Sequence, residues 1–164
     1  LEILRQKKNR MDSITMFHST IFEDSVLKKE NRNKTICFIE KHGVKNFANS
    51  FLGTLFYEGN KNECKNEIKR LTEIIYSTDK KTVIETSKAM RDRLSSVTLV
   101  EAVTKPFLFI IGKKDPVISL EANFKQAILP KYSQALFLHK TGHMGMFEEE
   151  KRSYEGINNF IQNL

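Results

Sequence analysis

Apolar positions along the chain occur as short continuous runs and as stripes of helical spacing. The runs lie at residues 14–17, 107–111 and 135–138, and turn residues follow each of them. Runs of this length are typical of strands, and the continuous run at 107–111 suits a strand buried on both faces of a parallel sheet. The pattern therefore predicts an α/β fold with these three strands.

Between the first two runs, apolar residues follow helical spacing with no strand pattern. At 44–51 they fall at i, i+3, i+4 and i+7, which marks an amphipathic helix. Four segments are predicted as helices in this interval: residues 24–42, 44–51, 64–75 and 78–94. Asp24 or Ser25 can cap the first of them, and Gly43 can end it.

Helices are also predicted outside this interval, at residues 1–10, after Ser119 and at the end of the chain. On the first, Leu1, Ile3 and Leu4 form the apolar side. The helix that Ser119 caps is expected to bury Leu120, Phe124, Ala127 and Ile128. The last helix is expected to lie on the sheet through Tyr154, Ile157, Ile161 and Leu164.

Two residues with catalytic potential follow the last two predicted strands. Asp115 comes three residues after Gly112, and His143 follows Thr141 and Gly142. Because open α/β sheets place their ligand crevice at the carboxyl ends of the strands, an acid and a histidine reach the same edge of the sheet.

This arrangement resembles the last part of an α/β hydrolase. In that family a nucleophile, an acid and a histidine follow in this order, each on a turn after a strand. Asp115 matches the acid and His143 the histidine, and Glu148, five residues on, opens the final helix as in family members. The resemblance implies a partial α/β-hydrolase parallel sheet, consisting of the last three strands, with an inserted all-helical cap.

By the same resemblance the chain divides into three parts. Residues 1–20 are the end of a core helix and the sixth strand, residues 21–103 are the helical cap, and residues 104–164 are the carboxyl-terminal core. Such caps close over the pocket and select the substrate. After the histidine, Met144, Met146 and Phe147 are candidates to line the acyl pocket, and packing of the helix onto the sheet is an equally good reading of them.

The implied chemistry is hydrolysis of an ester or another acyl bond of a small molecule. His143 is the candidate general base, and Asp115 orients its ring and stabilises its charged form. Some family members take the acid from the end of the sixth strand. That position holds His18 and Ser19 here, with Asp24 further on, so Asp115 is the better candidate. We expect no cofactor and no metal.

The nucleophile and the oxyanion hole of such an enzyme are not recognisable. No Gly-x-Ser-x-Gly occurs in the 164 residues, Ser50 lies within a helical stripe, and Ser19 lacks flanking glycines. We therefore predict that this chain alone hydrolyses nothing measurably. The alternative function is that of a non-catalytic hydrolase remnant that serves as an interaction module.

Chain length and the first strand suggest that a part of the hydrolase is missing. Sheets of this family usually need more than 164 residues, and the chain begins with Leu1, so we expect a fragment or a truncated product. Residues 14–17 would then form an unpaired strand edge. We expect the chain to require the missing amino-terminal half or to self-associate.

Composition changes this picture little. The net charge of +7 could indicate a nucleic-acid partner, but lysines are scattered among glutamates and no Arg-rich block or zinc-finger spacing is present. No apolar run approaches the roughly 20 residues that span a bilayer. We expect neither nucleic acid nor a membrane as partner.

The remaining cysteines and histidines are predicted to be structural or solvated. Cys37 and Cys64 are isolated in predicted helices, which indicates small core residues and, more weakly, a reducing cytoplasmic setting. His18, His42 and His139 have no partner that the sequence can identify, and all three are expected at the surface.

Overall fold

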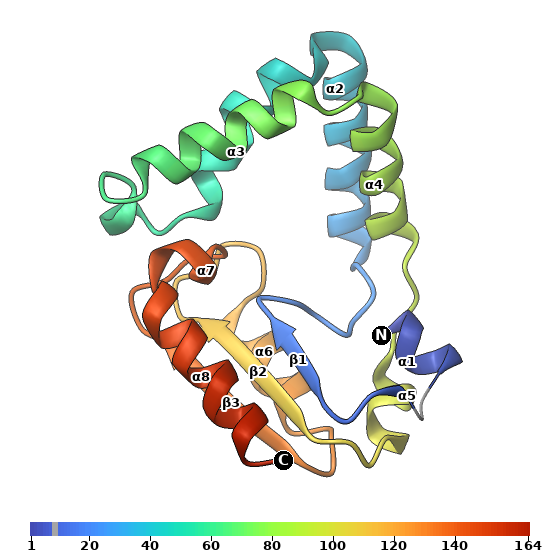
Figure 1. The fold of residues 1–164 in the computed structure, drawn as a ribbon. Helices are drawn as coiled ribbons and strands as arrows, with labels where there is room; N and C mark the ends of the chain where they lie inside the picture. The colour runs from blue at the N-terminus through green and yellow to red at the C-terminus, as the bar shows by residue number, and fades with distance from the viewer. Residues whose placement is uncertain (8–9) are drawn as a thin grey trace. The chain divides into compact units, whose positions relative to one another are not determined.

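The computed structural model describes residues 1–7 and 10–164, which form two compact units (Figure 1). The first, here called the sheet unit, consists of Leu1–Ile21, Leu55–Asn60 and Ser96–Leu164. The second, here called the helical unit, consists of Phe22–Thr54 and Lys61–Ser95. Each unit is described separately. Residues 8 and 9 of the predicted first helix lie outside the described residues.

Three parallel strands form the sheet, in the order β1-β2-β3. They are β1 (Ile14–Phe17), β2 (Phe107–Gly112) and β3 (Ser133–Leu138), and their first residues are paired in register. All six residues of β2 are buried because this strand is central. The predicted strands and the parallel sheet are confirmed, and β3 begins two residues earlier than the apolar run.

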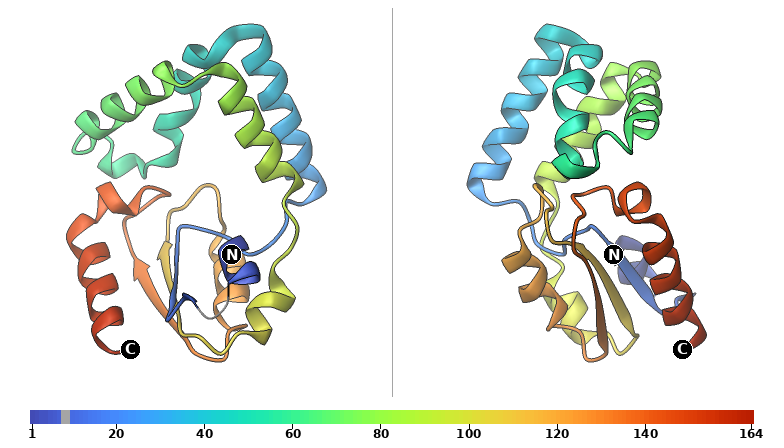
Figure 2. Two further views of the ribbon diagram at one scale, coloured as in Figure 1. Left: turned by 45° about the vertical axis from the view of Figure 1, so that its right-hand side comes forward. Right: turned by 90° about the vertical axis from the view of Figure 1, so that its left-hand side faces the viewer.

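Two helices cover opposite faces of the sheet (Figure 2). They are α6 (Leu120–Ala127) and α8 (Glu150–Gln162). On the α8 face, Leu108, Ile110 and Leu138 form a buried cluster with Phe160. A Cβ atom added at Gly156 would overlap the Leu136 side chain, so the glycine lets α8 approach β3 closely. This contact explains why a residue of low helix propensity occupies the helix interior.

The inward face of α6 differs from the prediction. Phe124 and Ile128, expected in the core, are 50% and 80% exposed, while Asn123 and Gln126 are buried. Gln126 accepts a hydrogen bond from the Ile21 amide at 3.0 Å and donates one to the Ser19 carbonyl at 2.8 Å. Buried backbone groups need hydrogen-bond partners, and the Gln126 side chain supplies them here to the irregular segment after β1.

In α1 (Glu2–Gln6) and α8, some of the residues predicted to be buried are exposed. In α1, Leu4 is fully buried but Ile3 is 68% exposed. In α8, Ile157 packs against the core as expected. Three of the other residues expected on the sheet are exposed: Tyr154, Ile161 and Leu164. Ser153 and Phe160 occupy the buried face instead, so the helix is rotated from the predicted orientation.

Short elements complete the sheet unit. A helix that the apolar pattern did not indicate, α5 (Val97–Ala102), precedes β2. The 3₁₀ turn η3 (Glu58–Asn60) lies between the predicted helices at 44–51 and 64–75, and α7 (Gly145–Glu148) follows β3. Within the described residues, no helix is long and apolar enough to cross a membrane.

The helical unit contains α2 (Val26–Phe51), α3 (Lys65–Ser77) and α4 (Lys80–Asp92), and the turn η2 (Leu52–Leu55) follows α2. Gly43 breaks α2 into two helices with a φ of 79°, in the left-handed region that favours glycine. Buried isoleucines of α2 and α4 form the core of this unit: Ile36, Ile39 and Ile84.

A capping hydrogen bond and two ion pairs lie at the start of α2. Ser25 caps α2 and accepts a hydrogen bond from the Lys28 amide at 3.3 Å. Its neighbour Asp24 is buried and forms ion pairs with Arg32 and Arg93. Of the two predicted caps, Ser25 is therefore the one used.

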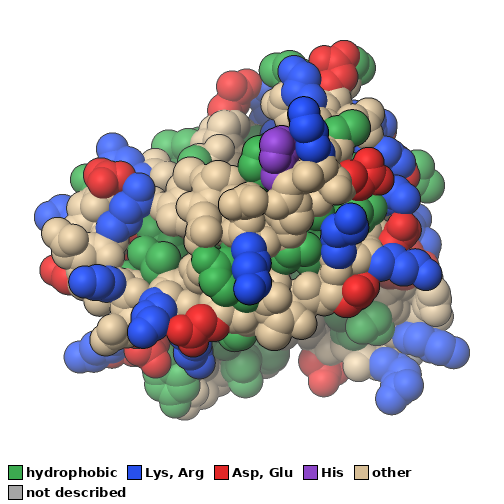
Figure 3. Space-filling model, turned by 90° about the horizontal axis from the view of Figure 1, so that it is seen from above, with side chains coloured by type: hydrophobic (Ala, Val, Ile, Leu, Met, Phe, Trp, Pro, Cys, Tyr) green, Lys and Arg blue, Asp and Glu red, His purple; other side chains and the backbone are tan. Residues whose placement is uncertain are grey.

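Surface features correct one expectation. Cys64 is buried, but Cys37, predicted in the core, is exposed, and neither is in a disulfide. On the face in Figure 3, lysine and arginine side chains are interspersed with acidic ones and do not gather into one block.

Candidate active site

The loop after β2 holds the Asp115 carboxylate by local hydrogen bonds. Its Oδ1 atom accepts from the backbone amides of Val117 at 2.7 Å and Ile118 at 3.0 Å. These bonds across two and three residues form the turn that aspartate favours after a strand. The side chain is 1% exposed, so the carboxylate is buried with Oδ1 fully occupied.

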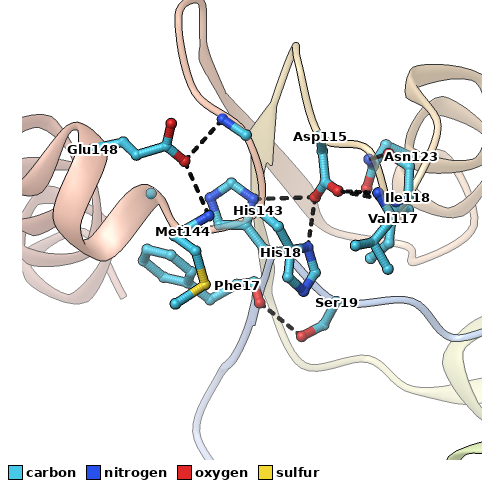
Figure 4. Close-up of polar contacts among 12 residues, drawn as sticks. Phe17, His18, Ser19, Asp115, Val117, Ile118, Asn123, His143, Met144 and Glu148 are labelled. Atoms are coloured by element: carbon cyan, nitrogen blue, oxygen red, sulfur yellow. Dashed lines mark hydrogen bonds and ion pairs between the residues drawn. The ribbon is translucent and has the colours of Figure 1, made fainter. Parts of the chain in front are cut away.

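His143 lies beside Asp115 at the end of the loop after β3. Its Nδ1 atom is 2.8 Å from Asp115 Oδ2 (Figure 4). Because a carboxylate can only accept, Nδ1 carries the proton and the neutral ring leaves Nε2 as an acceptor. The His143 side chain is 24% exposed, whereas that of Asp115 is buried. The structure thus brings the two predicted catalytic residues together with the polarity that a base and its orienting acid require.

Glu148 organises the backbone around His143. Its Oε1 atom accepts from the amides of Gly142 at 2.9 Å and Met144 at 3.2 Å (Figure 4). Its Oε2 atom accepts from the Tyr57 amide at 2.8 Å and the Asn60 side chain at 3.0 Å. The sequence indicated Glu148 only as a helix opener. Its carboxylate in fact joins the His143 loop to the turn at residues 55–60.

His18 is the functional candidate that the sequence analysis placed wrongly. It was expected at the surface, yet its side chain is 2% exposed and its Nδ1 atom lies 3.4 Å from Asp115 Oδ2. His18 follows β1 directly, with a φ of 41°. The left-handed region costs a residue with a Cβ atom about 1–2 kcal/mol. The other two histidines are exposed as predicted, but each contacts a neighbour: His42 the Phe38 ring and His139 the Lys113 ammonium group.

The surroundings of Asp115 keep its carboxylate ionised. Burial raises the pKa of Asp115, but the hydrogen bonds from His143 and His18, the electrostatic interaction with His143 and the Ile118 amide lower it by more. The pKa of Asp115 therefore lies well below its usual range. An acid that is ionised at neutral pH can stabilise a protonated imidazole.

The same three side chains have the composition of a possible metal site. The ligand atoms of His18, Asp115 and His143 lie within 4.8 Å of one another, and imidazole and carboxylate suit several divalent metals. In the structure, however, both Nδ1 atoms are directed at Asp115 Oδ2 as hydrogen-bond donors. Hydrogen bonding accounts for the arrangement without an ion.

The three predicted pocket residues lie next to His143 on and before α7. Met144 is half-buried and precedes the helix, Met146 is 39% exposed, and Phe147 is half-buried with its ring 6.5 Å from that of Phe56. Their role in substrate binding stays a prediction.

Both serines considered as nucleophiles donate their hydroxyl hydrogen to a nearby backbone carbonyl. Ser19 donates to the Phe17 carbonyl at 2.7 Å (Figure 4), and Ser50, inside α2, donates to the Phe47 carbonyl at 3.0 Å. The hydroxyls of both serines are thus engaged by backbone carbonyls, and the lack of a nucleophile in this chain stays a prediction.

Comparisons with known proteins identify the fold. No family model and no curated protein matches the sequence. An esterase from Thermogutta terrifontis matches with a TM-score of 0.88 and 21% identity, over 98% of this chain and 59% of its own. An enol-lactonase from Burkholderia xenovorans (TM-score 0.87) and an esterase from Exiguobacterium antarcticum (TM-score 0.85), both 13% identical, match over 98% of this chain and 60% of theirs.

The chain thus spans about 60% of the length of the solved structures it matches. At these identities the likeness establishes the fold. This confirms the predicted fold class, because a parallel sheet with helices inserted between β1 and β2 is what a partial α/β hydrolase with its cap would contain. The chain has a partial α/β-hydrolase fold with a helical cap.

Proposed function

We propose that this chain is the carboxyl-terminal part of a serine α/β hydrolase that acts on ester or other acyl bonds of small molecules. The observation that carries the proposal is the 2.8 Å hydrogen bond from His143 Nδ1 to the buried, ionised Asp115. Solved structures of the same fold include esterases and an enol-lactonase, which supports an acyl substrate.

The proposed roles follow from the polarity of the hydrogen bond. His143 Nε2 would take the proton of a serine hydroxyl as its oxygen attacks the acyl carbon, and would later give that proton to the leaving group. Asp115 would hold the ring in the Nδ1–H form and stabilise the transient imidazolium. The attacking serine and the oxyanion hole would come from a polypeptide segment other than these 164 residues.

Two further assignments complete the proposal. Residues 21–103 would act as the substrate-selecting cap, and Met144, Met146 and Phe147 would line the acyl side of the pocket. Without a nucleophile and an oxyanion hole, the isolated chain would lose many orders of magnitude in rate. We therefore expect no ester turnover by the chain alone.

The test begins with the coding DNA upstream of Leu1. An in-frame extension that encodes Gly-x-Ser-x-Gly would be co-expressed with the chain and assayed with p-nitrophenyl acetate. We expect turnover that is lost in His143→Ala and falls about 10⁴-fold in Asp115→Asn, as for the acid of other triads. His139→Ala is the matched control, because this exposed histidine should leave turnover unchanged.

Two results would contradict the proposal. Turnover by the two-part enzyme that survives His143→Ala would show that this residue is not the base. Turnover by the isolated chain, lost in His143→Ala, would show that the nucleophile lies within the 164 residues after all.

A second candidate function is a non-catalytic interaction module derived from a hydrolase. The observation that favours it is the lack of Gly-x-Ser-x-Gly in the 164 residues. A stop codon directly upstream of Leu1 would support this candidate, and the in-frame extension described above would argue against it.

A further inference from the structure

His18 contacts the acid of the proposed catalytic pair next to His143. Both histidines direct Nδ1 at the same carboxylate oxygen, Asp115 Oδ2, at 3.4 Å and 2.8 Å (Figure 4). Their rings meet edge to face, with centroids 5.8 Å apart. Since Val117 and Ile118 hold Oδ1, donors on both oxygens restrict rotation of the carboxylate.

The backbone around His18 is shaped to admit its ring. A Cβ atom added at Gly145 would overlap His18 Nε2, and one added at Gly112 would lie 2.9 Å from His18 Cε1. Gly112 ends the strand before Asp115, and Gly145 begins the helix after His143. Gly145 thus makes room for this imidazole, whereas a Cβ atom at Gly112 would first overlap the Gly142 and Thr141 carbonyl oxygens.

The protonation of His18 follows from its contacts. Asp115 can only accept, so His18 Nδ1 must carry a proton. His18 Nε2 is buried and has no hydrogen-bond partner among the described residues. A proton on Nε2 would therefore be a buried donor without an acceptor, which is costly, whereas a bare nitrogen is less so. The neutral ring with its hydrogen on Nδ1 is the form that fits.

We propose that His18 is a positioning residue, a neutral Nδ1–H imidazole that holds the Asp115 carboxylate in line with His143. Its meaning for catalysis rests on the proposed function, since His18 acts on the reaction only through Asp115. A side chain that merely filled space could be replaced by any group of similar volume. A positioning residue requires a donor at the place of Nδ1, and this requirement makes the two roles separable.

The first experiment determines the tautomers in the full chain labelled with ¹⁵N-histidine. Imidazole nitrogen chemical shifts distinguish protonated from bare nitrogens. We expect His18 and His143 both to carry hydrogen on Nδ1 and to have a bare Nε2 at neutral pH. A His18 ring with hydrogen on Nε2 and a bare Nδ1 would overturn the proposal, because no bond to Asp115 could then form.

The second experiment replaces His18 and observes the His143 Nδ1–H proton. In His18→Asn the amide nitrogen is bonded to Cγ, as Nδ1 is in histidine, so it can donate from the same place. Asparagine also tolerates a positive φ. His18→Gly also fits the backbone but has no donor. We expect solvent exchange of the His143 proton to stay near the wild-type rate in His18→Asn. In His18→Gly it should be about fivefold to tenfold faster, the equivalent of one hydrogen bond.

If the His143 Nδ1–H proton exchanges at the wild-type rate in a folded His18→Gly chain, the proposal is overturned. It is also overturned if exchange in His18→Asn is as fast as in His18→Gly. If His18→Gly does not fold, His18→Gln replaces it, because its amide is one carbon further out and cannot occupy the Nδ1 position. These readouts need no ester turnover. A failed turnover assay with a normal His18 response would therefore refute the proposed function and leave the positioning role standing.

Discussion

Replacing Asp115 with asparagine tests the hydrogen-bond network at its centre. In Asp115→Asn, Oδ1 can still accept from the Val117 and Ile118 amides. The amide nitrogen takes the place of Oδ2 and points two hydrogens at the Nδ1 atoms of His143 and His18. Because those atoms already carry hydrogen, both imidazoles must move their proton to Nε2. A single isosteric change should therefore invert two tautomers.

The expected loss of stability can be worked out from these contacts. Hydrogen bonds to charged groups contribute about 1.5–3 kcal/mol and neutral ones about 0.5–1.5, so two weakened bonds cost about 2 kcal/mol. The new Nε2–H of His18 is buried without an acceptor, at a cost of about 1–3 kcal/mol. Removal of the buried charge of Asp115 offsets part of these two free-energy costs. We expect the free energy of unfolding at pH 7 to fall by about 2–4 kcal/mol.

The pH dependence of this loss has a definite sign. The folded-state pKa of Asp115 is depressed, so its stabilising contribution is complete above the unfolded-state pKa of about 3.9. That contribution decreases as the pH falls from there towards the folded-state value. The difference between wild type and Asp115→Asn should therefore be largest near neutrality and should shrink below about pH 4.

Urea unfolding followed by circular dichroism measures both effects. Asp79→Asn is the matched control, because Asp79 caps α4 through the Thr82 amide and asparagine caps helices equally well. A variant at Asp115 as stable as wild type at pH 7 would refute the reasoning. A stability difference that does not shrink in acid would show that the carboxylate charge is not its source.

Two further substitutions probe the supports of the site. Glu148→Gln places an amide among four N–H donors and should lower the free energy of unfolding by about 1–3 kcal/mol, with faster hydrogen exchange of the Gly142 amide. Stability unchanged from wild type would contradict this role. Gly145→Ala should cost about 1–3 kcal/mol in thermal or urea unfolding because its methyl group overlaps His18. Gly53→Ala, in open space, is its control, and equal effects would contradict the packing argument.

The sheet could be predicted from sequence because its strands are short and bounded by turns. Apolar side chains fill both faces of β2, so no helical stripe competes with the strand pattern. The pair Asp115 and His143 could be located for a related reason. Both follow parallel strands, and the carboxyl ends of neighbouring parallel strands meet at one edge.

Helix orientation was less predictable because tertiary contacts override apolar spacing. In α6 the apolar stripe pointed to Phe124 and Ile128, yet the buried positions are Asn123 and Gln126. The Gln126 amide bonds backbone atoms of the segment after β1, and Asn123 accepts a hydrogen bond from Gln126 and donates to the Ile118 and Ser119 carbonyls. The backbone groups that Gln126 bonds lie far from the helix in sequence: Ser19 and Gln126 are 107 residues apart. Such a distant requirement leaves no periodic pattern in the helix sequence.

His18 escaped the sequence analysis although a usable signal was present. Judged alone, a histidine after a short strand has no partner, because the contact to Asp115 spans 97 residues. Judged by topology, it occupies the same kind of position as the other two. His18, Asp115 and His143 each follow one of three parallel, adjacent strands at the carboxyl end. Any titratable residue in that position is a neighbour of the others by construction of the sheet. Polar residues at the ends of adjacent parallel strands can pair with one another when buried, so the strand order alone predicts that His18 lies beside Asp115.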